Sequence, residues 1–367
     1  MSTLYIAAAG AGKTTYMVDD AFRQSSSVDN KILITTFTDN NTLEIKQKFY
    51  SIYGFIPHNI DILPWFTFLL RECVRPYQQF MFTERINGLH LVDKISAKEV
   101  TEKDVKRFFF DEKNRIYSDK LANFAFKLNR CSEGLSIKRL YKLYTTIFID
   151  EIQDMAGYDF ELIKILHEVG INIIMAGDPR QTIFPNHPAK KNKKYFGHID
   201  NFIRDNRLDI NIDTQKLHKT YRNNPSICNF ANKFYPEMQP CESANMQKTV
   251  HDGIFIVKKS QVRQYYDTYH PAILRDSKKK LVDFDSSSQL TVYNFMKSKG
   301  LGFDRVLIYP TNPLIQWIKN QNKELKPQTR AKSYVAVTRA RFSVAFVVKD
   351  KDAKQVSQSA GIPLWTP

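Results

Sequence analysis

The stretch that most constrains the fold of this chain is a loop of small residues near its beginning. Residues 7–15 read Ala-Ala-Ala-Gly-Ala-Gly-Lys-Thr-Thr, and they follow a β-prone run that starts at Leu4. A helical pattern over 13–24 comes next, and a continuous apolar run over 31–37 follows it. Strand, loop, helix and strand in this order form one βαβ unit, which is the element of a parallel sheet. The loop and its surroundings therefore predict an α/β fold.

Further apolar runs extend this pattern along the chain. Runs over 145–150 and 171–176 are typical of buried strands, and a helical stretch over 160–169 separates them. A second α/β pattern begins near residue 207, with apolar runs over 253–257, 305–309 and 344–348. We expect two α/β lobes.

One segment of the first lobe departs from the α/β alternation. Residues 62–138 are rich in Phe, Lys and Arg and show no strand alternation, so we expect a helical insertion there. The expected domains are 1–61 with 139–205 as the first lobe, 62–138 as the insertion and 206–367 as the second lobe. Pro, Asn and Lys cluster over 185–194, where we expect a hinge or linker, and we expect a loop over 276–289.

The composition narrows the choice of partner and compartment. The 367 residues include 54 Lys and Arg against 38 Asp and Glu, a formal charge of +16. This excess favours a polyanion such as nucleic acid, although some proteins are basic without such a partner. No apolar run approaches the roughly 20 residues that span a bilayer, and no basic leader precedes the first strand, so export and a membrane partner are not expected. The four cysteines lack metal-binding spacing, which favours reduced thiols and a cytoplasmic location.

The loop over 7–15 has the chemistry of a phosphate-binding loop. Small residues allow backbone N–H groups to approach phosphates, and the helix that follows adds the positive end of its dipole. We expect Lys13 to reach the β- and γ-phosphates and the Thr14 hydroxyl to bind Mg²⁺. The first glycine of the general pattern is Ala7 here. The alternative is an Ala/Gly-rich turn with a chance Gly-Lys-Thr.

Two acids follow the apolar run Ile147–Ile149. They are Asp150 and Glu151, and the position of Asp150 at the carboxyl edge of the sheet is where ligands of such folds bind. Asp150 can hold Mg²⁺ there while Glu151 orients and deprotonates an attacking water. Taken alone, the pair is also compatible with a plain strand terminus. Together with Lys13, it predicts hydrolysis of a nucleoside triphosphate.

Six ordered motifs carry a resemblance to a known family. They are AAAGAGKTT, FIDEIQD, GDPRQTIF, KTYRNNPSICNFANKF, KSKGLGFDRV and YVAVTRAR, and they span residues 7–341. This combination resembles the UvrD/Rep-like superfamily 1 DNA helicases. The resemblance implies two RecA-like P-loop NTPase lobes with parallel sheets, a small mainly helical insertion in the first lobe, and ATP and Mg²⁺ as cofactors.

The resemblance also implies roles for individual residues. Gln153 and Gln181 match glutamines that sense the γ-phosphate, and Tyr221 matches an aromatic residue that stacks on adenine. Arg222 and Arg339 match arginines of the second lobe that stabilise transition-state charge only when the cleft between the lobes is closed. The alternative for both is a surface arginine without a catalytic role. The nucleotide-binding residues implied are Ala9, Gly10, Ala11, Gly12, Lys13, Thr14, Thr15, Gln153 and Tyr221.

A strand-binding face is implied in the first lobe. Thr36, Phe37 and Thr38 resemble a strand-contacting loop of the family, and Trp65 lies where a second such element is expected. The rings of Phe37, Trp65 and Phe184 are candidates for stacking on bases, each worth about 1–3 kcal/mol. Core packing is the alternative for each ring.

The sequence departs from the family pattern at several places. No glutamine element precedes the phosphate loop, so we expect relaxed nucleotide choice. Asn294, Met296 and Gly302 replace the Thr, His and Glu that are usual in the fifth motif, and the aromatic-Arg-Gly continuation after Phe184 is missing. The interval 222–301 is too short for the large insertion of the second lobe, so we expect a reduced form of the enzyme.

These observations leave two functions from different classes. The first is an ATP-dependent 3′–5′ translocase or helicase that acts on single-stranded DNA or on DNA with a single-stranded tail; only the resemblance gives its direction. The second is an ATP-gated subunit that senses DNA and controls a partner nuclease or replication protein without unwinding activity of its own. A P-loop kinase for a small metabolite would leave Gln181, Arg222 and Arg339 without roles.

Overall fold

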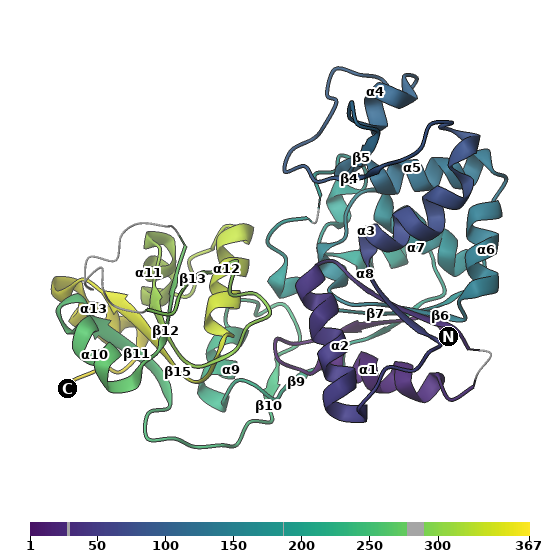
Figure 1. Ribbon diagram of the computed structural model, residues 1–367. Helices are drawn as coiled ribbons and strands as arrows, with labels where there is room; N and C mark the ends of the chain where they lie inside the picture. Colours follow the sequence, from purple (N-terminus) through teal and green to yellow (C-terminus); the bar gives the residue numbers. More distant parts are fainter. Residues whose placement is uncertain (28–29, 186, 277–289) are drawn as a thin grey trace. The chain divides into compact units, whose positions relative to one another are not determined.

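The structure is a computed structural model that describes residues 1–27, 30–185, 187–276 and 290–367 (Figure 1). The chain divides into two compact units, of which the first comprises residues 1–6 and 13–213 and the second 7–12 and 214–367. This boundary differs from the expected one after residue 205 because the strand β8 (Asn211–Asp213) pairs with β1 (Thr3–Ile6). The loop expected over 276–289 lies, except for Asp276, outside the described residues. None of the described helices has the length and apolarity that a bilayer span requires.

The first unit is built on a six-stranded parallel sheet with helices on both faces. The strand order is β3-β2-β6-β7-β1-β8. The strands not yet given are β2 (Ile32–Thr36), β3 (Ile60–Pro64), β6 (Thr146–Ile149) and β7 (Asn172–Gly177), and the flanking helices are α1 (Lys13–Gln24), α2 (Asp39–Tyr53), α7 (Tyr158–Glu168) and α8 (Ile199–Asp205). Right-handed crossovers place α1 and α2 on one face and α7 and α8 on the other (Figure 1). The predicted α/β fold with a parallel sheet is confirmed.

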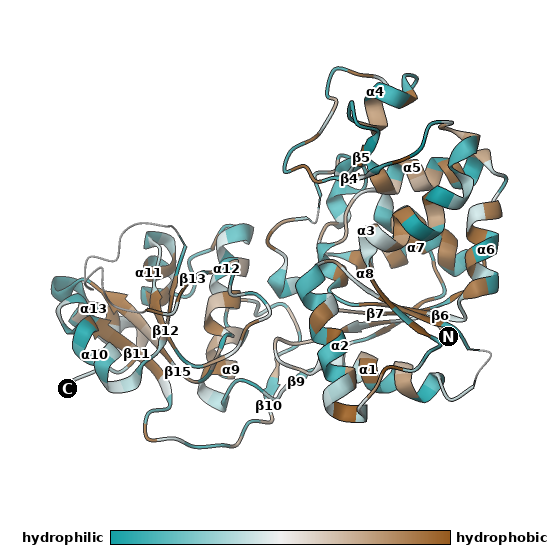
Figure 2. Ribbon diagram, in the orientation of Figure 1, coloured by the Kyte–Doolittle hydropathy of each residue, from teal (hydrophilic) through white to brown (hydrophobic). Residues whose placement is uncertain are grey.

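Burial and capping explain why these segments form these elements. β2 and β6 are buried at every position, as expected for strands covered on both faces, and Figure 2 shows the strands of the sheet as predominantly hydrophobic. α1 buries Met17, Val18 and Ala21 on one face. α2 begins after Thr38, whose hydroxyl accepts a hydrogen bond from the N–H of Asn41. This cap fixes the loop between β2 and α2.

The region after β3 contains more strand than the sequence predicted. Ile62 lies inside β3, which pairs with β2, so the segment predicted to be a helical insertion begins within the main sheet. Farther on, β4 and β5 form a short parallel pair. The segment is nevertheless mainly helical, as expected, and its two three-residue strands carry too little alternation to be recognised in the sequence. The elements here are α3 (Trp65–Phe68), a π-helical turn (Leu69–Val74), a 3₁₀ turn (Arg75–Phe80), β4 (Gly88–His90), α4 (Val105–Phe109), β5 (Arg115–Tyr117), α5 (Ser118–Cys131) and α6 (Leu135–Leu143).

Residues 185 and 187–194, from the segment predicted to be a hinge or linker, lie within the first unit. They pack against the start of α7: a Cβ placed on Gly157 would lie 2.8 Å from the Cβ of Ala189. The Asn192 side chain also donates a hydrogen bond to the Gly157 carbonyl at 3.0 Å. The prediction was wrong because Pro, Asn and Lys indicate a loop but do not indicate what the loop packs against.

The second unit is a five-stranded parallel sheet with order β11-β15-β14-β12-β13. Its strands are β11 (Gly253–Lys258), β12 (Ala272–Arg275), β13 (Val292–Asn294), β14 (Phe303–Tyr309) and β15 (Ala340–Val348). Its helices are α9 (Pro225–Asn232), α10 (Val262–Tyr269), α11 (Asn312–Lys319), α12 (Pro327–Val337) and α13 (Asp350–Ala360), and the pair β9 (Lys219–Thr220) and β10 (Glu242–Ser243) precedes the main sheet. The strands predicted around 253–257, 305–309 and 344–348 are therefore confirmed.

Candidate functional site

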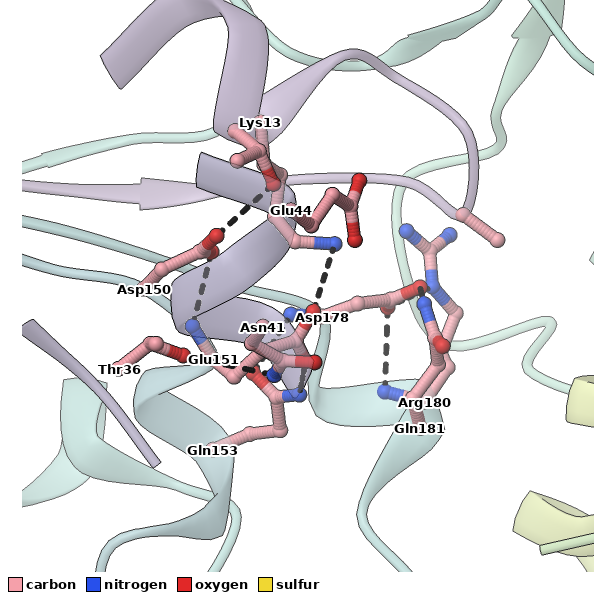
Figure 3. Close-up of polar contacts among 12 residues, drawn as sticks. Lys13, Thr36, Asn41, Glu44, Asp150, Glu151, Gln153, Asp178, Arg180 and Gln181 are labelled. Atoms are coloured by element: carbon pink, nitrogen blue, oxygen red, sulfur yellow. Dashed lines mark hydrogen bonds and ion pairs between the residues drawn. The ribbon is translucent and has the colours of Figure 1, made fainter. Parts of the chain in front are cut away.

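The first helix and the end of β6 bring four predicted residues together. The Thr14 hydroxyl donates a hydrogen bond to Asp150 Oδ2 at 2.8 Å. Lys13, the first residue of α1, is buried, and its Nζ lies 3.8 Å from Glu151 Oε1 (Figure 3). Parallel strands place their carboxyl ends at one edge of the sheet, which is why residues 136 positions apart meet here.

The electrostatics of Asp150 favour a cation beside it. Burial raises the pKa of this carboxyl group to about 6, the charge of Glu151 adds to the rise, and Lys13 and the Thr14 hydrogen bond oppose it. A buried carboxylate next to a hydroxyl supplies two oxygen ligands, which suits Mg²⁺ that completes its shell with water and phosphate oxygens. Among the described residues, no group of three or more His, Cys, Asp and Glu side chains could hold a metal by itself. The donor set therefore fits Mg²⁺ bound together with a nucleotide.

Glu151 and Gln153 connect β6 to the end of β7. Glu151 has a left-handed backbone with φ 55°, and its carboxylate accepts a hydrogen bond from the Gln153 side chain. Gln153 Oε1 in turn accepts from the backbone N–H of Asp178 at 3.1 Å. A Cβ on Gly177 would lie 2.4 Å from Gln153 Oε1, so the close approach requires glycine at that position. Gln153 thus joins the ends of two adjacent strands.

The end of β7 holds a second polar cluster. Gln181 Nε2 donates to Asp178 Oδ2 at 3.0 Å, and Arg180 Nε donates to Asp178 Oδ1 at 2.7 Å (Figure 3). All three side chains are buried. Sequence reasoning selected Gln181 but missed Asp178 and Arg180. The signal was present in GDPRQ, where two charged residues follow a buried strand.

The phosphate loop has the backbone that its glycines permit. Gly10 and Gly12 have φ of 73° and 78°. Residues 7–12 group with the second unit, where the N–H of Tyr221 donates to the Gly10 carbonyl at 3.0 Å. A Cβ on Gly10 would lie 2.6 Å from the Cβ of Arg222, so this position has no room for a side chain. Ala9 and Ala11 are buried on either side.

The second unit holds the remaining predicted nucleotide-site residues. Tyr221 is 69% exposed, so its ring is accessible. Arg222 donates to the Thr338 carbonyl at 3.4 Å. Arg339 is 1% exposed, and its guanidinium donates to the carbonyls of Val335 and Leu301 at 3.0 and 3.1 Å. The surface alternative is thereby excluded for Arg339 in this conformation, and its role at a phosphate stays a prediction.

The predicted strand-binding residues other than Trp65 differ in how far they are exposed. Phe37 is half-buried and meets Phe66 edge to face, with ring centroids 5.1 Å apart, and Phe184 is 44% exposed. Thr38 is exposed, whereas Thr36 is buried and accepts a hydrogen bond from the Asn41 side chain. Sequence reasoning missed Phe66, although it lies next to Trp65.

Trp65 occupies a different environment from the one its proposed stacking role needs. Its side chain is fully buried, and its indole N–H donates to Asp159 Oδ1 at 2.8 Å. No ring face is available to a base in this structure, so the core-packing alternative applies and Trp65 is corrected from a stacking residue to a core residue. Thr15, also predicted at the nucleotide, is half-buried and accepts a hydrogen bond from Lys48 at 3.3 Å.

Part of the chain is similar to a known helicase domain and to a curated protein. Residues 77–193 match the model of the UvrD/REP helicase N-terminal domain. The chain is 27% identical over 250 residues to the Gabija protein GajB of Bacillus cereus (strain VD045), a match that covers 64% of this chain and 46% of the relative. The chain therefore spans less than half the length of this curated relative.

Solved structures show more distant similarity. The Arterivirus nonstructural protein 10 helicase is 14% identical with a TM-score of 0.45, covering 97% of this chain and 61% of that one. Its complex with DNA is also 14% identical with a TM-score of 0.45, covering 98% and 62%. The PRRSV helicase is 15% identical with a TM-score of 0.44, covering 95% and 52%.

The structure shows two α/β units, each built on a parallel sheet, and a loop with two glycines between β1 and α1. Within this chain, residues 77–193 are similar to the N-terminal domain of the UvrD/REP helicases.

Proposed function

We propose that this chain is an ATP-dependent 3′–5′ translocase or helicase that acts on single-stranded DNA. The observation that carries the proposal is the site at the carboxyl edge of the first sheet, where Thr14 donates to Asp150 and Lys13 lies 3.8 Å from Glu151. A lysine, a hydroxyl and two carboxylates in this arrangement match the needs of phosphoryl transfer to water.

In the proposed mechanism the residues of the first unit have distinct tasks. Lys13 binds the β- and γ-phosphates. Thr14 and Asp150 would hold Mg²⁺, which would supply neutralisation of the phosphate charge. Glu151 orients the attacking water and accepts its proton. Its hydrogen bond from Gln153 and the Gln153–Asp178 contact hold the carboxylate in position.

The second unit supplies the remaining parts. Tyr221 stacks on the nucleobase, and its exposure supports this role. Arg222 and Arg339 stabilise charge that develops on the γ-phosphate, worth about 10³–10⁵ in rate for such an arginine. Arg339 must exchange its carbonyl contacts for phosphate contacts, which makes hydrolysis depend on a rearrangement in this unit.

A strand of DNA is proposed to lie on the first unit along Phe37, Phe66 and Phe184. Phe37 and Phe66 form one aromatic surface, and base stacking on such rings does not depend on sequence. The net charge of +16 supports a polyanionic partner. The 3′–5′ direction rests on the resemblance of the DEIQD and GDPRQTI motifs alone.

The second candidate is an ATP-gated DNA-sensing subunit that controls a partner nuclease or replication protein. Two observations favour it: the fifth motif departs from the family pattern at Asn294, Met296 and Gly302, and the interval 222–301 is too short for the large insertion of the second lobe. In this role DNA stimulates ATP turnover, but the chain alone does not separate strands.

ATP turnover with and without single-stranded DNA, followed by strand displacement on duplexes with 3′ or 5′ tails, tests both candidates. The translocase or helicase predicts that single-stranded DNA stimulates ATP turnover in a salt-sensitive way. It also predicts strand displacement only on duplexes with 3′ tails. Stimulation without displacement supports the sensing subunit. ATP turnover that single-stranded DNA does not change at low salt contradicts both candidate functions.

A further inference from the structure

A cavity of about 360 Å³ lies in the first unit, outside the site described above. Its walls come from the segment 95–102, from α4 and α5, and from the loops at 157–158 and 187–191. None of the predicted nucleotide- or DNA-binding residues lines it. Its size falls within the range of small-ligand sites.

Close backbone packing forms one wall of the cavity. Gly157 has φ 62°, and a Cβ there would lie 2.8 Å from the Cβ of Ala189 and 3.4 Å from His187 Cε1. His187 is held by Asp159, with 3.0 Å between Nε2 and Oδ2. Ala97, in the segment 95–102, has the rarely adopted φ of 44°. The wall at Gly157 is fixed by its close contacts with Ala189 and His187.

The charged groups of the lining favour an anion. Lys98, Lys120, Lys190 and Lys191 line the cavity, against Glu102 and Asp119. Both carboxylates already have donors: Asp119 accepts from the Ser96 N–H at 2.9 Å and the Ser96 hydroxyl at 2.6 Å, and Glu102 pairs with Lys127.

Two of the four lysines are available at the rim. Lys120 lies 4.1 Å from the Phe108 ring centroid and Lys191 lies 3.2 Å from Glu161, so both are engaged. Lys98 and Lys190 are exposed, and in the described part of the chain neither has an ion pair. Lys98 lies in the segment 95–102 and Lys190 in the loop 187–191, so both parts of the lining present a cation to an anion.

The interior offers aromatic surface and an unsatisfied acceptor. Phe108 and Tyr158 both line the cavity. Asn123 is 6% exposed, its side-chain N–H donates to Glu102, and its Oδ1 has no hydrogen-bond partner among the described residues. A buried acceptor without a partner is costly, so a rotation of Asn123 that brings Oδ1 to an N–H group of a ligand, in exchange for its bond to Glu102, would satisfy it.

We propose that this cavity binds a phosphorylated nucleotide, with the phosphate at the lysines of the lining and the base beside Phe108 and Tyr158, whose rings also carry Lys120 and Lys191. The ligand combines an anion, an aromatic ring and N–H donors, which are the features that the lining complements. Its source is either a free mononucleotide or the phosphorylated end of a strand. The site goes beyond the proposed function and requires no hydrolysis at Lys13. Experiments can therefore contradict the nucleotide-binding proposal without contradicting the proposed function, and the reverse.

Calorimetric binding of AMP, and of tetradeoxyadenylate with and without a 5′-phosphate, tests the proposal. All measurements use the full chain carrying Lys13→Ala, which weakens binding at the phosphate loop. The K98E/K190E double variant is compared with K103E/K193E, which makes the same charge change at exposed lysines outside the cavity lining. Thermal unfolding of both variants checks their folding, and Lys190→Glu alone serves as a milder second variant.

The proposal predicts saturable binding that K98E/K190E weakens at least about tenfold and K103E/K193E does not. Equal binding of AMP and the 5′-phosphorylated tetramer identifies a free-nucleotide site, and binding of only the phosphorylated tetramer identifies a strand-end site. Absence of saturable binding, or an equal loss in both double variants, overturns the proposal.

Discussion

His187 Nε2 and Asp159 Oδ2 lie 3.0 Å apart, and both side chains are almost completely buried. Asp159 also accepts the indole N–H of Trp65, so one carboxylate joins the start of α3, the start of α7 and the loop after β7. Burial lowers the pKa of His187, but the charge and hydrogen bond of Asp159 outweigh it and leave this pKa raised. Burial by itself would raise the pKa of Asp159. The charge and hydrogen bond of His187 have the opposite and larger effect, so the pKa of Asp159 is lowered.

This pair predicts a pH-dependent stability. A raised histidine pKa stabilises the fold below about pH 6.5, and the contribution is lost as pH rises through the folded-state value; a lowered aspartate pKa stabilises it above about pH 4. The free energy of unfolding should therefore fall between pH 6 and pH 9. His187→Gln should flatten this slope and cost about 3 kcal/mol at pH 6, because it leaves Asp159 buried without its partner. Denaturant titrations at both pH values measure this.

The control for the pair is His198→Gln, which replaces an exposed histidine. It should keep the wild-type slope. If the unfolding free energy of His187→Gln depended on pH as the wild type does, other groups would be responsible for the pH dependence.

Lys13→Ala should reduce ATP turnover at least about 100-fold, because it removes the cation nearest to Glu151 and the expected phosphate contact. Binding of single-stranded DNA should change little, since the proposed strand contacts lie elsewhere. Steady-state turnover and fluorescence anisotropy measure the two effects. A variant that loses both equally would indicate a structural role for Lys13.

Arg339→Ala should lower the turnover rate at saturating ATP by about 10³ while changing ATP affinity far less. Because Arg339 is buried, thermal unfolding must accompany the kinetics. Arg341→Ala, which removes an exposed guanidinium 3.0 Å from Asp304, is the matched control and should leave the rate unchanged. If Arg339→Ala lowered only the affinity for ATP, Arg339 would not contribute to stabilising the transition state.

Phe37→Ala and Phe66→Ala should each weaken binding of single-stranded DNA by about 1–3 kcal/mol. Their combined effect should be less than the sum, because the two rings contact each other. Tyr50→Ala on α2, an exposed ring outside this surface, should have no effect. Additive losses, or an equal loss with Tyr50→Ala, would argue against a shared stacking surface.

Trp65→Ala should act on stability instead. Loss of a fully buried indole and its bond to Asp159 should cost about 3–5 kcal/mol of unfolding free energy. DNA binding measured well below the melting temperature should remain near the wild-type level. A large binding defect in a folded variant would restore Trp65 to the strand-binding face.

Local sequence patterns predicted those parts of the protein whose structure depends only on residues close together in the chain. The loop at 7–15 and the helix that follows it need only glycine conformations, small side chains and amphipathic spacing, and α1 spans the predicted residues 13–24. The continuous apolar runs predicted buried parallel strands for the same reason, and the resemblance of the motifs to a helicase family supplied the roles that spacing alone does not give.

The tertiary structure decided what depends on residues far apart in the chain. It made Trp65 a core residue through Asp159, packed the segment 185–194 against Gly157, and brought Arg180 and Asp178 into the polar cluster beside Gln181. No local pattern carries this information, because whether an aromatic or charged side chain is exposed depends on which distant segments cover it. The sequence by itself determined the chemistry available at the sheet edge, and long-range packing determined which side chains can use it.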